Sequence, residues 1–298
     1  MAKTSSFSVT SLRTLFSVSL ACSLLSVHMI SKAETIPSLT ESSAPESKNV
    51  NQKKRDLSLT KALPKPMLDE LLSNMVLVEA GSFSLGSDSP LARKREQPVR
   101  PVTLDSFYIS KYELTQDIFE QVMGWNYSYF QCGNCPVNNV SWFNMQLFIE
   151  RLNGITGKKF SLPTEAQWAY AAKGGNKSKG FKYSGSNTLN DVAWFADNAN
   201  KKSHPVGLKQ PNELGLYDMT GNLWEFCLDD MSRKAYSRIE SHNPFIGDKK
   251  NLKRKAMKVI RGGGYEFNAT ENLVFMRDGA TNNVRMPDIG YRLVMSTD

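Results

Sequence analysis

The stretch Arg261–Asn272, RGGGYEFNATEN, places three consecutive glycines between a β-branched run and an irregular polar segment. A phosphate-binding loop would open a helix and carry Lys followed by Ser or Thr, and a dinucleotide-binding loop would space its glycines before a helix. Neither pattern is present here. The preceding run Lys258–Ile260 predicts a strand, and the glycines predict a place where one backbone passes close to another.

Outward from these glycines, short apolar runs alternate with turns. The alternation in Met75–Ser87 and Pro101–Thr115 predicts strands. Three helices are expected: QDIFEQVMG after Thr115, WFNMQLFIERLNG after Ser141 and EAQWAYAAKGG after Thr164, the last two ending at glycines. The remainder, Gly174–Asp298, predicts loops around a small sheet. A domain with so little regular structure needs an internal staple, either a bound metal or a disulfide.

Several long segments occur in a fixed order along the chain. They are GSFSLGSDS, PVTLDSFYISKYELTQDIFEQVMG, PVNNVSWFNMQLFIERLN, FSLPTEAQWAYAAKGG, VAWFADNAN, HPVGLKQPNELGLYDMTGNLWEFCLDD and VIRGGGY with IGYRLV. Together they resemble the formylglycine-generating-enzyme family, also called the sulfatase-modifying-factor domain family, over about Met75–Ser296. The resemblance implies an α+β fold, an irregular C-type-lectin-like variant with low secondary-structure content.

Three parts of the chain are expected: a signal peptide at 1–33, a polar tether at 34–73 and the family domain at 74–298. Lys3 and Arg13 precede the apolar run Leu15–Ile30, and Ser31–Ala33 offers the small-x-small pattern that signal peptidase reads. We therefore expect export, periplasmic or secreted, with cleavage after Ala33. Two alternatives stay open: the run is retained as a membrane anchor, or a nearby cysteine, Cys22, is the lipid-modified residue of a lipoprotein.

The charge pattern argues against nucleic-acid binding. The chain of 298 residues carries a formal charge of +8, but its basic clusters, Gln52–Arg55 and Lys249–Lys255, lack interleaved aromatic residues. Such clusters are typical of solvated loops. A membrane is expected as a partner only if the N-terminal segment is retained.

The copper chemistry of the family is not expected. Copper-dependent members place two cysteines after the Gly-Gly-Ser-Tyr strand, and this chain has Phe267 and Asn272 there, with Gly264 in place of the serine. Neither side chain can bind Cu(I), which prefers thiolates. A second branch binds iron through several histidines, and after signal removal only His204 and His242 remain. The sequence therefore predicts no copper, no iron and no formylglycine generation.

Calcium is the metal that the resemblance implies. Calcium takes several oxygen ligands in a flexible cage. In YDMTGNLWEF the implied ligands are the side chains of Asp218 and Glu225 and the carbonyls of Gly221 and Leu223. A turn with solvated acids is the alternative reading. A second, weaker candidate site consists of Asp191, Asn198 and Asn200.

The pair Cys132 and Cys135, in QCGNC, admits a local disulfide, a redox dithiol or half of a zinc site. Zinc would need two more ligands, and Cys227 is the only other thiol of the domain. A redox role would require a helix start beside the pair. We therefore expect a structural disulfide, with Cys227 as a buried apolar residue.

The expected functional feature is a cleft lined by Trp224, Gly264, Tyr265, Phe267, Asn272 and Arg277. The sequence predicts an accessory or binding module for a protein, peptide or glycan partner, and leaves catalysis undecided. One alternative is a periplasmic maturation enzyme with other chemistry, similar to family members that mature a siderophore chromophore. Another is a diversified lectin-like protein, for which the asparagines at 268, 272, 282 and 283 are too sparse.

Overall fold

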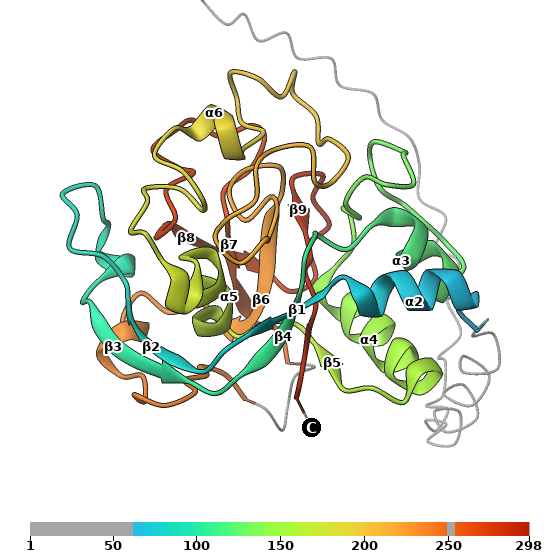
Figure 1. Ribbon diagram of the computed structural model, residues 1–298, viewed down its shortest axis with the longest axis horizontal. Helices are drawn as coiled ribbons and strands as arrows, with labels where there is room; N and C mark the ends of the chain where they lie inside the picture. The colour runs from blue at the N-terminus through green and yellow to red at the C-terminus, as the bar shows by residue number, and fades with distance from the viewer. Residues whose placement is uncertain (1–61, 249–253, 298) are drawn as a thin grey trace, which may run out of the picture. The chain divides into compact units, whose positions relative to one another are not determined.

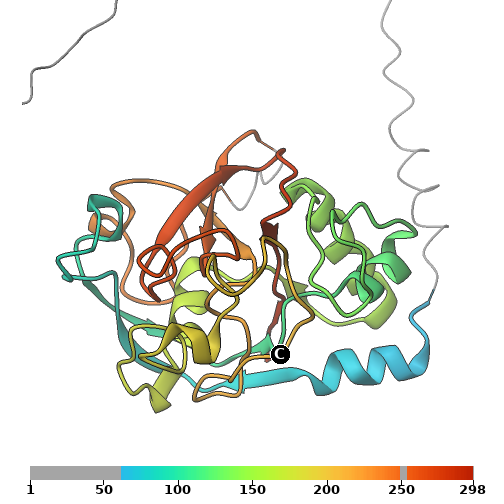
Figure 2. The ribbon, with the colours of Figure 1, turned by 90° about the horizontal axis from the view of Figure 1, so that it is seen from above.

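The computed structural model describes residues 62–248 and 254–297 (Figures 1 and 2). The predicted signal peptide, the first part of the tether and Cys22 lie outside this described part. No helix in it is long and apolar enough to cross a membrane.

Short helices and short strands alternate with long loops. The helices are α2 Lys65–Ser73, α3 Gln116–Met123, α4 Trp142–Thr156, α5 Glu165–Ala172 and α6 Leu189–Val192, with 3-10 turns η1 Lys94–Glu96, η2 Gly175–Lys177 and η3 Ala235–Ser237. The strands are β1 Met75–Val78, β2 Gly81–Leu85, β3 Arg100–Leu104, β4 Phe107–Ser110, β5 Phe160–Ser161, β6 Trp224–Asp230, β7 Met257–Arg261, β8 Arg277–Thr281, β9 Ile289–Gly290 and β10 Val294–Met295.

The three predicted helices form where the sequence places them. Helix α3 ends at Gly124, whose φ of 79° suits glycine. Helix α4 starts at Ser141, whose hydroxyl accepts a hydrogen bond from the Asn144 amide, and it ends at Gly157. The predicted end at Gly154 was therefore one turn too early. Helix α5 starts with a capping box between Thr164 and Gln167.

Two four-stranded sheets and a two-stranded ribbon make up the β-structure. The first sheet has the order β1-β4-β10-β5, so the start and the end of the domain pair with the same strand. The second has the order β8-β7-β6-β9, in which β9 runs parallel to β6 and the other neighbours are antiparallel. The ribbon pairs β2 with β3. The second sheet carries the glycine stretch, because Arg261 is the last residue of β7.

Helix α2 corrects the predicted domain boundary. It continues into β1 along one edge of the domain (Figure 2). Leu63 and Leu71 are buried in the same apolar cluster as the α3 and α4 side chains. The expectation of a tether up to Ser73 is wrong for residues 62–73, because this segment buries apolar area against the core. The sequence signal for this helix is the segment Leu68–Leu72, LDELL, whose leucines lie one helical turn apart.

Candidate functional site

The glycines after β7 do bring two backbones together. Gly262 and Gly263 have φ values of 99° and 77°, in the left-handed region that favours glycine. A Cβ at position 263 would lie 2.2 Å from Oδ1 of Asn272. Any larger residue at position 263 would displace Asn272, so the glycines are needed for this approach.

Three of the predicted cleft residues lie together. The rings of Trp224 and Phe267 meet edge to face, with centroids 5.5 Å apart. A Cβ on Gly264 would lie 3.4 Å from both rings. Trp224 is only 5% exposed and belongs to the apolar core, so Phe267 is the member of this group that reaches the surface.

Asn272 ties the segment after the glycines to itself. Its Nδ2 donates to the carbonyl oxygens of Phe267 at 3.0 Å and of Asn268 at 2.9 Å. Its side chain is fully buried, and Oδ1 has no hydrogen-bond partner among the described residues. The amide therefore closes a turn at a position where the copper-dependent members carry a cysteine.

Tyr265 lies in a separate small apolar cluster. It packs with Leu223 and Ala199, and Phe130 and Trp194 cover the cluster from outside. Burial, followed by the charges of Glu266 and Asp288, raises the pKa of the Tyr265 hydroxyl. The hydroxyl therefore remains protonated.

Arg277 is not part of the predicted cleft, and this assignment was wrong. Its Nε and Nη2 donate to the two carboxylate oxygens of Glu165 at 2.6 and 2.5 Å. Its Nη1 donates to the carbonyls of Arg95 and Ser232. Glu165 also accepts from the Tyr236 hydroxyl at 2.7 Å. Because every donor group of the guanidinium has a partner inside the protein, Arg277 is a structural residue.

An exposed aromatic loop, Trp125–Phe130, was missed by the sequence reasoning. Tyr127 is 57% exposed and Tyr129 is 69% exposed. The rings of Tyr129 and Phe130 meet edge to face at 4.9 Å, and Phe130 lies 6.3 Å from Tyr265. The sequence signal was the run WNYSYF, which has too many aromatic residues for an ordinary solvated loop.

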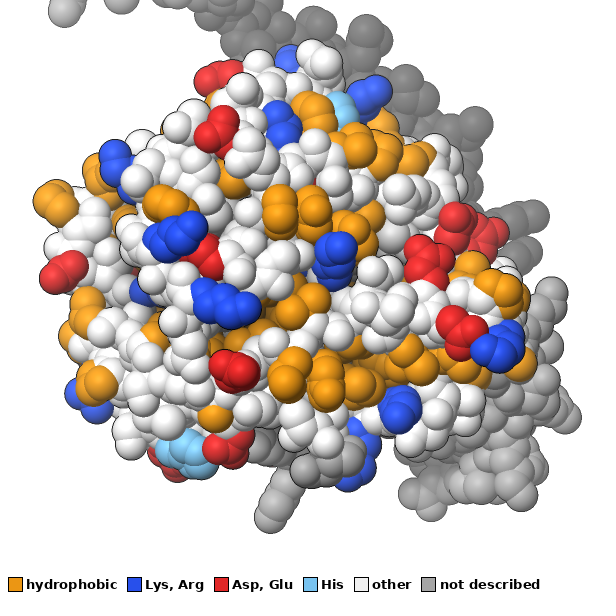
Figure 3. Space-filling view, viewed as in Figure 1, with side chains coloured by type: hydrophobic (Ala, Val, Ile, Leu, Met, Phe, Trp, Pro, Cys, Tyr) orange, Lys and Arg blue, Asp and Glu red, His pale blue; other side chains and the backbone are white. Residues whose placement is uncertain are grey.

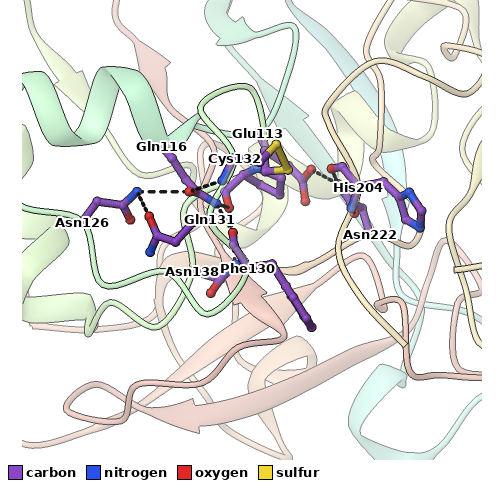
Figure 4. Close-up of a disulfide and its surroundings, with 11 residues drawn as sticks. Glu113, Gln116, Asn126, Phe130, Gln131, Cys132, Asn138, His204 and Asn222 are labelled. Atoms are coloured by element: carbon purple, nitrogen blue, oxygen red, sulfur yellow. Dashed lines mark hydrogen bonds between the residues drawn. A yellow bond between two sulfur atoms is a disulfide. The ribbon is translucent and has the colours of Figure 1, made fainter. Parts of the chain in front are cut away.

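Gln116 holds this loop in place (Figure 4). Its Nε2 donates to the carbonyls of Phe130 and Pro136, and its Oε1 accepts from the Cys132 amide and from Asn126. Gln116 is the first residue of α3 and is only 1% exposed. Its hydrogen bonds to the loop therefore lie inside the protein.

The predicted disulfide is confirmed. Cys132 and Cys135 are bonded, and the Cys135 amide donates to the Cys132 carbonyl. Cys227 is the free cysteine of the described part and is buried, and burial raises the pKa of its thiol. Within residues 62–248 and 254–297, no group of three or more His, Cys, Asp or Glu side chains is placed to hold a metal ion. Because Cys132 and Cys135 are bonded to each other, their sulfurs are not thiolates that could bind zinc.

The residues of the implied calcium site divide into two sets. Three buried oxygens, Oδ1 of Asp218 and the carbonyls of Gly221 and Leu223, receive no hydrogen bond from the described residues. Glu225 differs, because both of its carboxylate oxygens accept from Arg292 and Oε2 also accepts from the Trp168 indole at 2.6 Å. The unsatisfied oxygens fit a cation, whereas Glu225 already has a cationic partner.

Glu113 is a further buried acid, which the sequence reasoning missed. It is directed at Asn222 (Figure 4), whose Nδ2 donates to Oε2 at 2.6 Å, and Oε1 accepts from the Leu223 amide. Burial and the charges of Asp218 and Glu225 raise the pKa of Glu113 well above its usual range. Three acids thus lie near one arginine, Arg292, and the excess negative charge needs a proton or a cation.

The three residues proposed for the weaker, second calcium site do not lie together as ligands. Asn198 uses its side chain to close a local turn, accepting from the Phe195 amide and donating to Asn190 and Ala193. Asp191 instead accepts from the Ser186 hydroxyl. Asn200 is exposed. These three residues therefore do not form a ligand set.

His204 is held by contacts inside the protein. Its ring stacks on Trp194 at 3.8 Å, and its Nε2 lies 2.9 Å from the Ala199 carbonyl. Lys209 covers the Trp194 ring at 4.3 Å.

On the face of the molecule shown in Figure 3, basic and acidic side chains are interspersed around apolar ones.

Comparison with known proteins places the chain. A model of the sulfatase-modifying factor enzyme 1-like domain matches residues 60–297. Chaperone protein LppX of Paenibacillus barcinonensis is 34% identical over 275 residues, covering 75% of this chain and 89% of LppX. Mouse formylglycine-generating enzyme is 26% identical over 267 residues, covering 68% of each protein. The solved structure of Treponema denticola variable protein 1 has a TM-score of 0.62 at 28% identity, covering 74% of this chain and 94% of that one.

These matches agree with the predicted α+β, C-type-lectin-like fold of low regular structure, which is confirmed. The match to the family model begins at residue 60, before α2. This agrees with the burial of Leu63 and Leu71 in the core of the domain. The chain therefore belongs to the sulfatase-modifying-factor domain family, whose members include the formylglycine-generating enzymes.

Proposed function

We propose that this protein is an exported accessory protein that binds a partner polypeptide and does not catalyse copper-dependent cysteine oxidation. The exposed aromatic loop carries the proposal, because Tyr127 and Tyr129 present large apolar rings to solvent and Phe130 of the same loop packs against Tyr265. Tyrosine offers contact area at low entropic cost, which is why it is enriched at binding surfaces. The name of the relative LppX, a chaperone protein, supports a polypeptide as the partner.

The same region lacks the ligands of the oxidases. Phe267 packs against Trp224, and Asn272 donates to backbone carbonyls. With copper supplied, the protein should convert no cysteine of a sulfatase-type peptide to formylglycine. It should also bind Cu(I) no better than a variant without Cys132, Cys135 and Cys227. Formation of formylglycine would overturn the proposal.

Binding can be tested on an array of defined peptides that vary in charge and aromatic content. The wild-type domain should bind a subset of them, and the double variant Tyr127→Ala, Tyr129→Ala should lose at least tenfold in affinity. Leu91→Ala is the matched control, because Leu91 is 53% exposed and lies outside the aromatic loop. Equal binding by the double variant would contradict the proposal. A covalent change in a bound peptide, seen by mass spectrometry, would favour an enzyme instead.

Export is part of the proposal. The charged start, the apolar run Leu15–Ile30 and the small-x-small pattern before Glu34 support it, and the disulfide suits an oxidising compartment. Mass spectrometry of the mature protein should find an N-terminus at Glu34. A lipid-modified Cys22, or an intact chain in the membrane, would contradict this.

We also propose a structural calcium ion held by Asp218 and the carbonyls of Gly221 and Leu223. Their unsatisfied oxygens, and the excess of buried carboxylates, support it. Glu225, on the strand that follows these residues, forms an ion pair with Arg292. The bound ion would supply positive charge and fix the irregular backbone.

A further inference from the structure

Several asparagines of the chain stand in the pattern Asn-x-Ser/Thr, in which x is not proline. This pattern marks the acceptor of N-linked glycans in exported proteins. So short a motif also occurs by chance, and the surroundings of each asparagine decide which of them can serve as an acceptor in the folded protein. The asparagines in this pattern are Asn126, Asn139, Asn176 and Asn268.

Three of these asparagines already use their side-chain amide nitrogen inside the protein. Nδ2 of Asn126 donates to two glutamine side chains. Nδ2 of Asn139 donates to the Tyr127 carbonyl at 2.8 Å. Nδ2 of Asn176 donates to the Ala80 carbonyl at 2.9 Å. A sugar could join any of these nitrogens only after the chain around it had opened.

The other polar groups of these three motifs are also occupied. Ser128, the third residue of the first motif, is only 4% exposed, and its hydroxyl donates to a backbone carbonyl. Ser141, the third residue of the second motif, is 7% exposed and caps α4. Oδ1 of Asn176 accepts from the Tyr170 hydroxyl at 2.8 Å. An enzyme that must grip both the asparagine and the hydroxyl therefore cannot reach these motifs in the folded domain.

The fourth motif is open. All three of its residues, Asn268, Ala269 and Thr270, are exposed. Oδ1 of Asn268 accepts from the Thr270 amide at 2.9 Å and from the Thr270 hydroxyl at 2.7 Å, in the turn that asparagine forms with the residue two positions on. Among the described residues, no group accepts a hydrogen bond from its Nδ2. The nitrogen is therefore the free end of this amide.

The backbone of the motif is held by the segment after the glycines. The Asn268 carbonyl accepts from Nδ2 of Asn272 at 2.9 Å and from the Glu271 amide at 3.1 Å. Asn272 is fully buried, and Gly263 leaves the space that its side chain needs. The exposed turn is thus fixed to the core before any enzyme binds, so little ordering is needed for recognition.

We propose that Asn268 is the acceptor of an N-linked glycan, transferred after export from an oligosaccharide that is attached to a lipid through a diphosphate. Nδ2 forms a bond to the anomeric carbon of the first sugar while the bond from that carbon to the diphosphate breaks. The lipid diphosphate leaves with the bonding electron pair, and a base of the transferring enzyme takes the proton from Nδ2. The step needs no oxidant or reductant.

The place of the glycan suits a family member without the oxidase ligands. Asn268 lies between Phe267 and Asn272, the two positions where copper-dependent members carry cysteines. A glycan there would cover a position that an enzyme acting on a peptide must keep open. The inference goes beyond the proposed function and requires only export from it.

Mass spectrometry of the protein purified from its own source tests the modification. After proteolysis, the peptide that contains Asn268 should carry the glycan, and fragmentation should locate the added mass on that residue. The peptides that contain the other three asparagines should be unmodified. An exported chain with a mature N-terminus at Glu34 and a bare Asn268 would overturn this inference and leave export standing. A bare Asn268 in a chain that is not exported would overturn both.

The choice among the four motifs is tested on the unglycosylated mature protein. It is incubated with a lipid-linked oligosaccharide and an oligosaccharyltransferase that requires only Asn-x-Ser/Thr. Because modification at the other three motifs requires hydrogen bonds to open, Asn268 should react about tenfold faster or more. Synthetic peptides that span each motif supply the reference rates without the fold. If the four sites of the folded protein react in the same ratio as the peptides, the structure does not select Asn268 and the inference fails.

Two variants at one exposed position provide the matched pair. Thr270→Val keeps the shape of the side chain and removes the hydroxyl, so it should abolish modification of Asn268. Thr270→Ser keeps the hydroxyl and should retain the modification. Glycan on Asn268 of the Thr270→Val variant would contradict the assignment of the motif.

Discussion

Glu225 and Arg292 form an ion pair with no exposure of either side chain, between β6 and the segment that joins β9 to β10. Arg292 also donates to the carbonyls of Ser110 and Tyr217, so a single guanidinium connects four parts of the chain. The burial of Arg292 disfavours its charge, but the Glu225 carboxylate compensates and raises its pKa. Arg292 is therefore charged in the folded protein.

Replacing Arg292 by methionine should destabilise the domain strongly. The change would leave Glu225 buried and unpaired, which typically costs about 3–5 kcal/mol of unfolding free energy. Urea denaturation measures this. Lys65→Met serves as the control, because the Lys65–Asp69 pair is exposed and should contribute about 0.5 kcal/mol or less. Equal losses in the two variants would mean that the buried pair does not stabilise the fold.

Asp229 should make stability depend on pH. Its carboxylate accepts from the amides of Glu165 and Ile246, and burial, with a contribution from Glu165, raises its pKa from 3.8 to about 7. Between these two pH values the folded state holds a proton that the unfolded state has lost. Stability should therefore fall as pH rises through this window, by up to about 1.4 kcal/mol per pH unit for this proton, and level off above it.

Urea denaturation from pH 4 to pH 8 would measure how the unfolding free energy changes with pH. Asp229→Asn should remove the contribution of one proton from this slope, whatever the variant's stability at any single pH. The Glu165 carboxylate, whose pKa is lowered, acts in the opposite direction and at lower pH, so it does not mask the effect. A slope that Asp229→Asn leaves unchanged would show that Asp229 is ionised throughout.

Sequence reasoning reached the chemistry of single residues but not their partners. The resemblance implied that the Glu225 side chain is a calcium ligand, yet nothing in the chain indicates that Arg292, 67 residues away, faces it. Arg277 was misplaced for the same reason, because its partner Glu165 lies 112 residues away. Long-range pairing of buried charges is set by the tertiary fold, which local patterns do not encode.

At the scale of elements, the segment Asn126–Pro136 depends on α3. Gln116 supplies four hydrogen bonds to it, and the disulfide closes only its last turn. Gln116→Ala should therefore expose backbone amides and leave buried carbonyls unsatisfied, at a cost of about 1–3 kcal/mol. Hydrogen exchange of the segment should accelerate in this variant, while α4 keeps its protection.

The double variant Cys132→Ser, Cys135→Ser is the comparison for Gln116→Ala. A bridge between residues three apart closes a very short loop, so its removal should speed exchange less than loss of Gln116 does. Faster exchange without the disulfide than without Gln116 would reverse this order and make the disulfide the principal support of the aromatic loop.

The elements differ in how well the sequence predicts them. Helices α3, α4 and α5 each follow a Ser or Thr, the residue types that favour a helix start, so their starts were predicted to the residue. Helix α2 follows Pro64 and has no such residue before it, and only its burial makes it part of the domain. Loops such as Trp125–Phe130 have no period at all, which is why the exposed aromatic surface was not predicted.

At the scale of the whole molecule, the fold was predicted from the resemblance to the family. The apolar periodicity of the sequence did not predict it, because few segments have a regular period. The two apolar clusters meet around β6 and β7, and α2, α3 and α4 contribute to one while α5 and the β2–β3 ribbon contribute to the other. Buried acids, including Glu113 and Asp218 in loops and Glu225 on β6, carry charges that must be balanced for the fold to persist.

Removal of calcium should therefore lower the melting temperature of the whole domain. An ion that binds only the folded state at 100 times its dissociation constant adds about 2.7 kcal/mol of stability, which corresponds to roughly 5–10 °C for a domain of this size. Scanning calorimetry with calcium and with a chelator measures the difference. Asp218→Asn should abolish most of it, because Asp218 has the unsatisfied carboxylate oxygen, whereas Asp197→Asn, at an exposed position, should retain it. If chelation leaves the wild-type melting curve unchanged, the buried acids are balanced by protons and the calcium proposal fails.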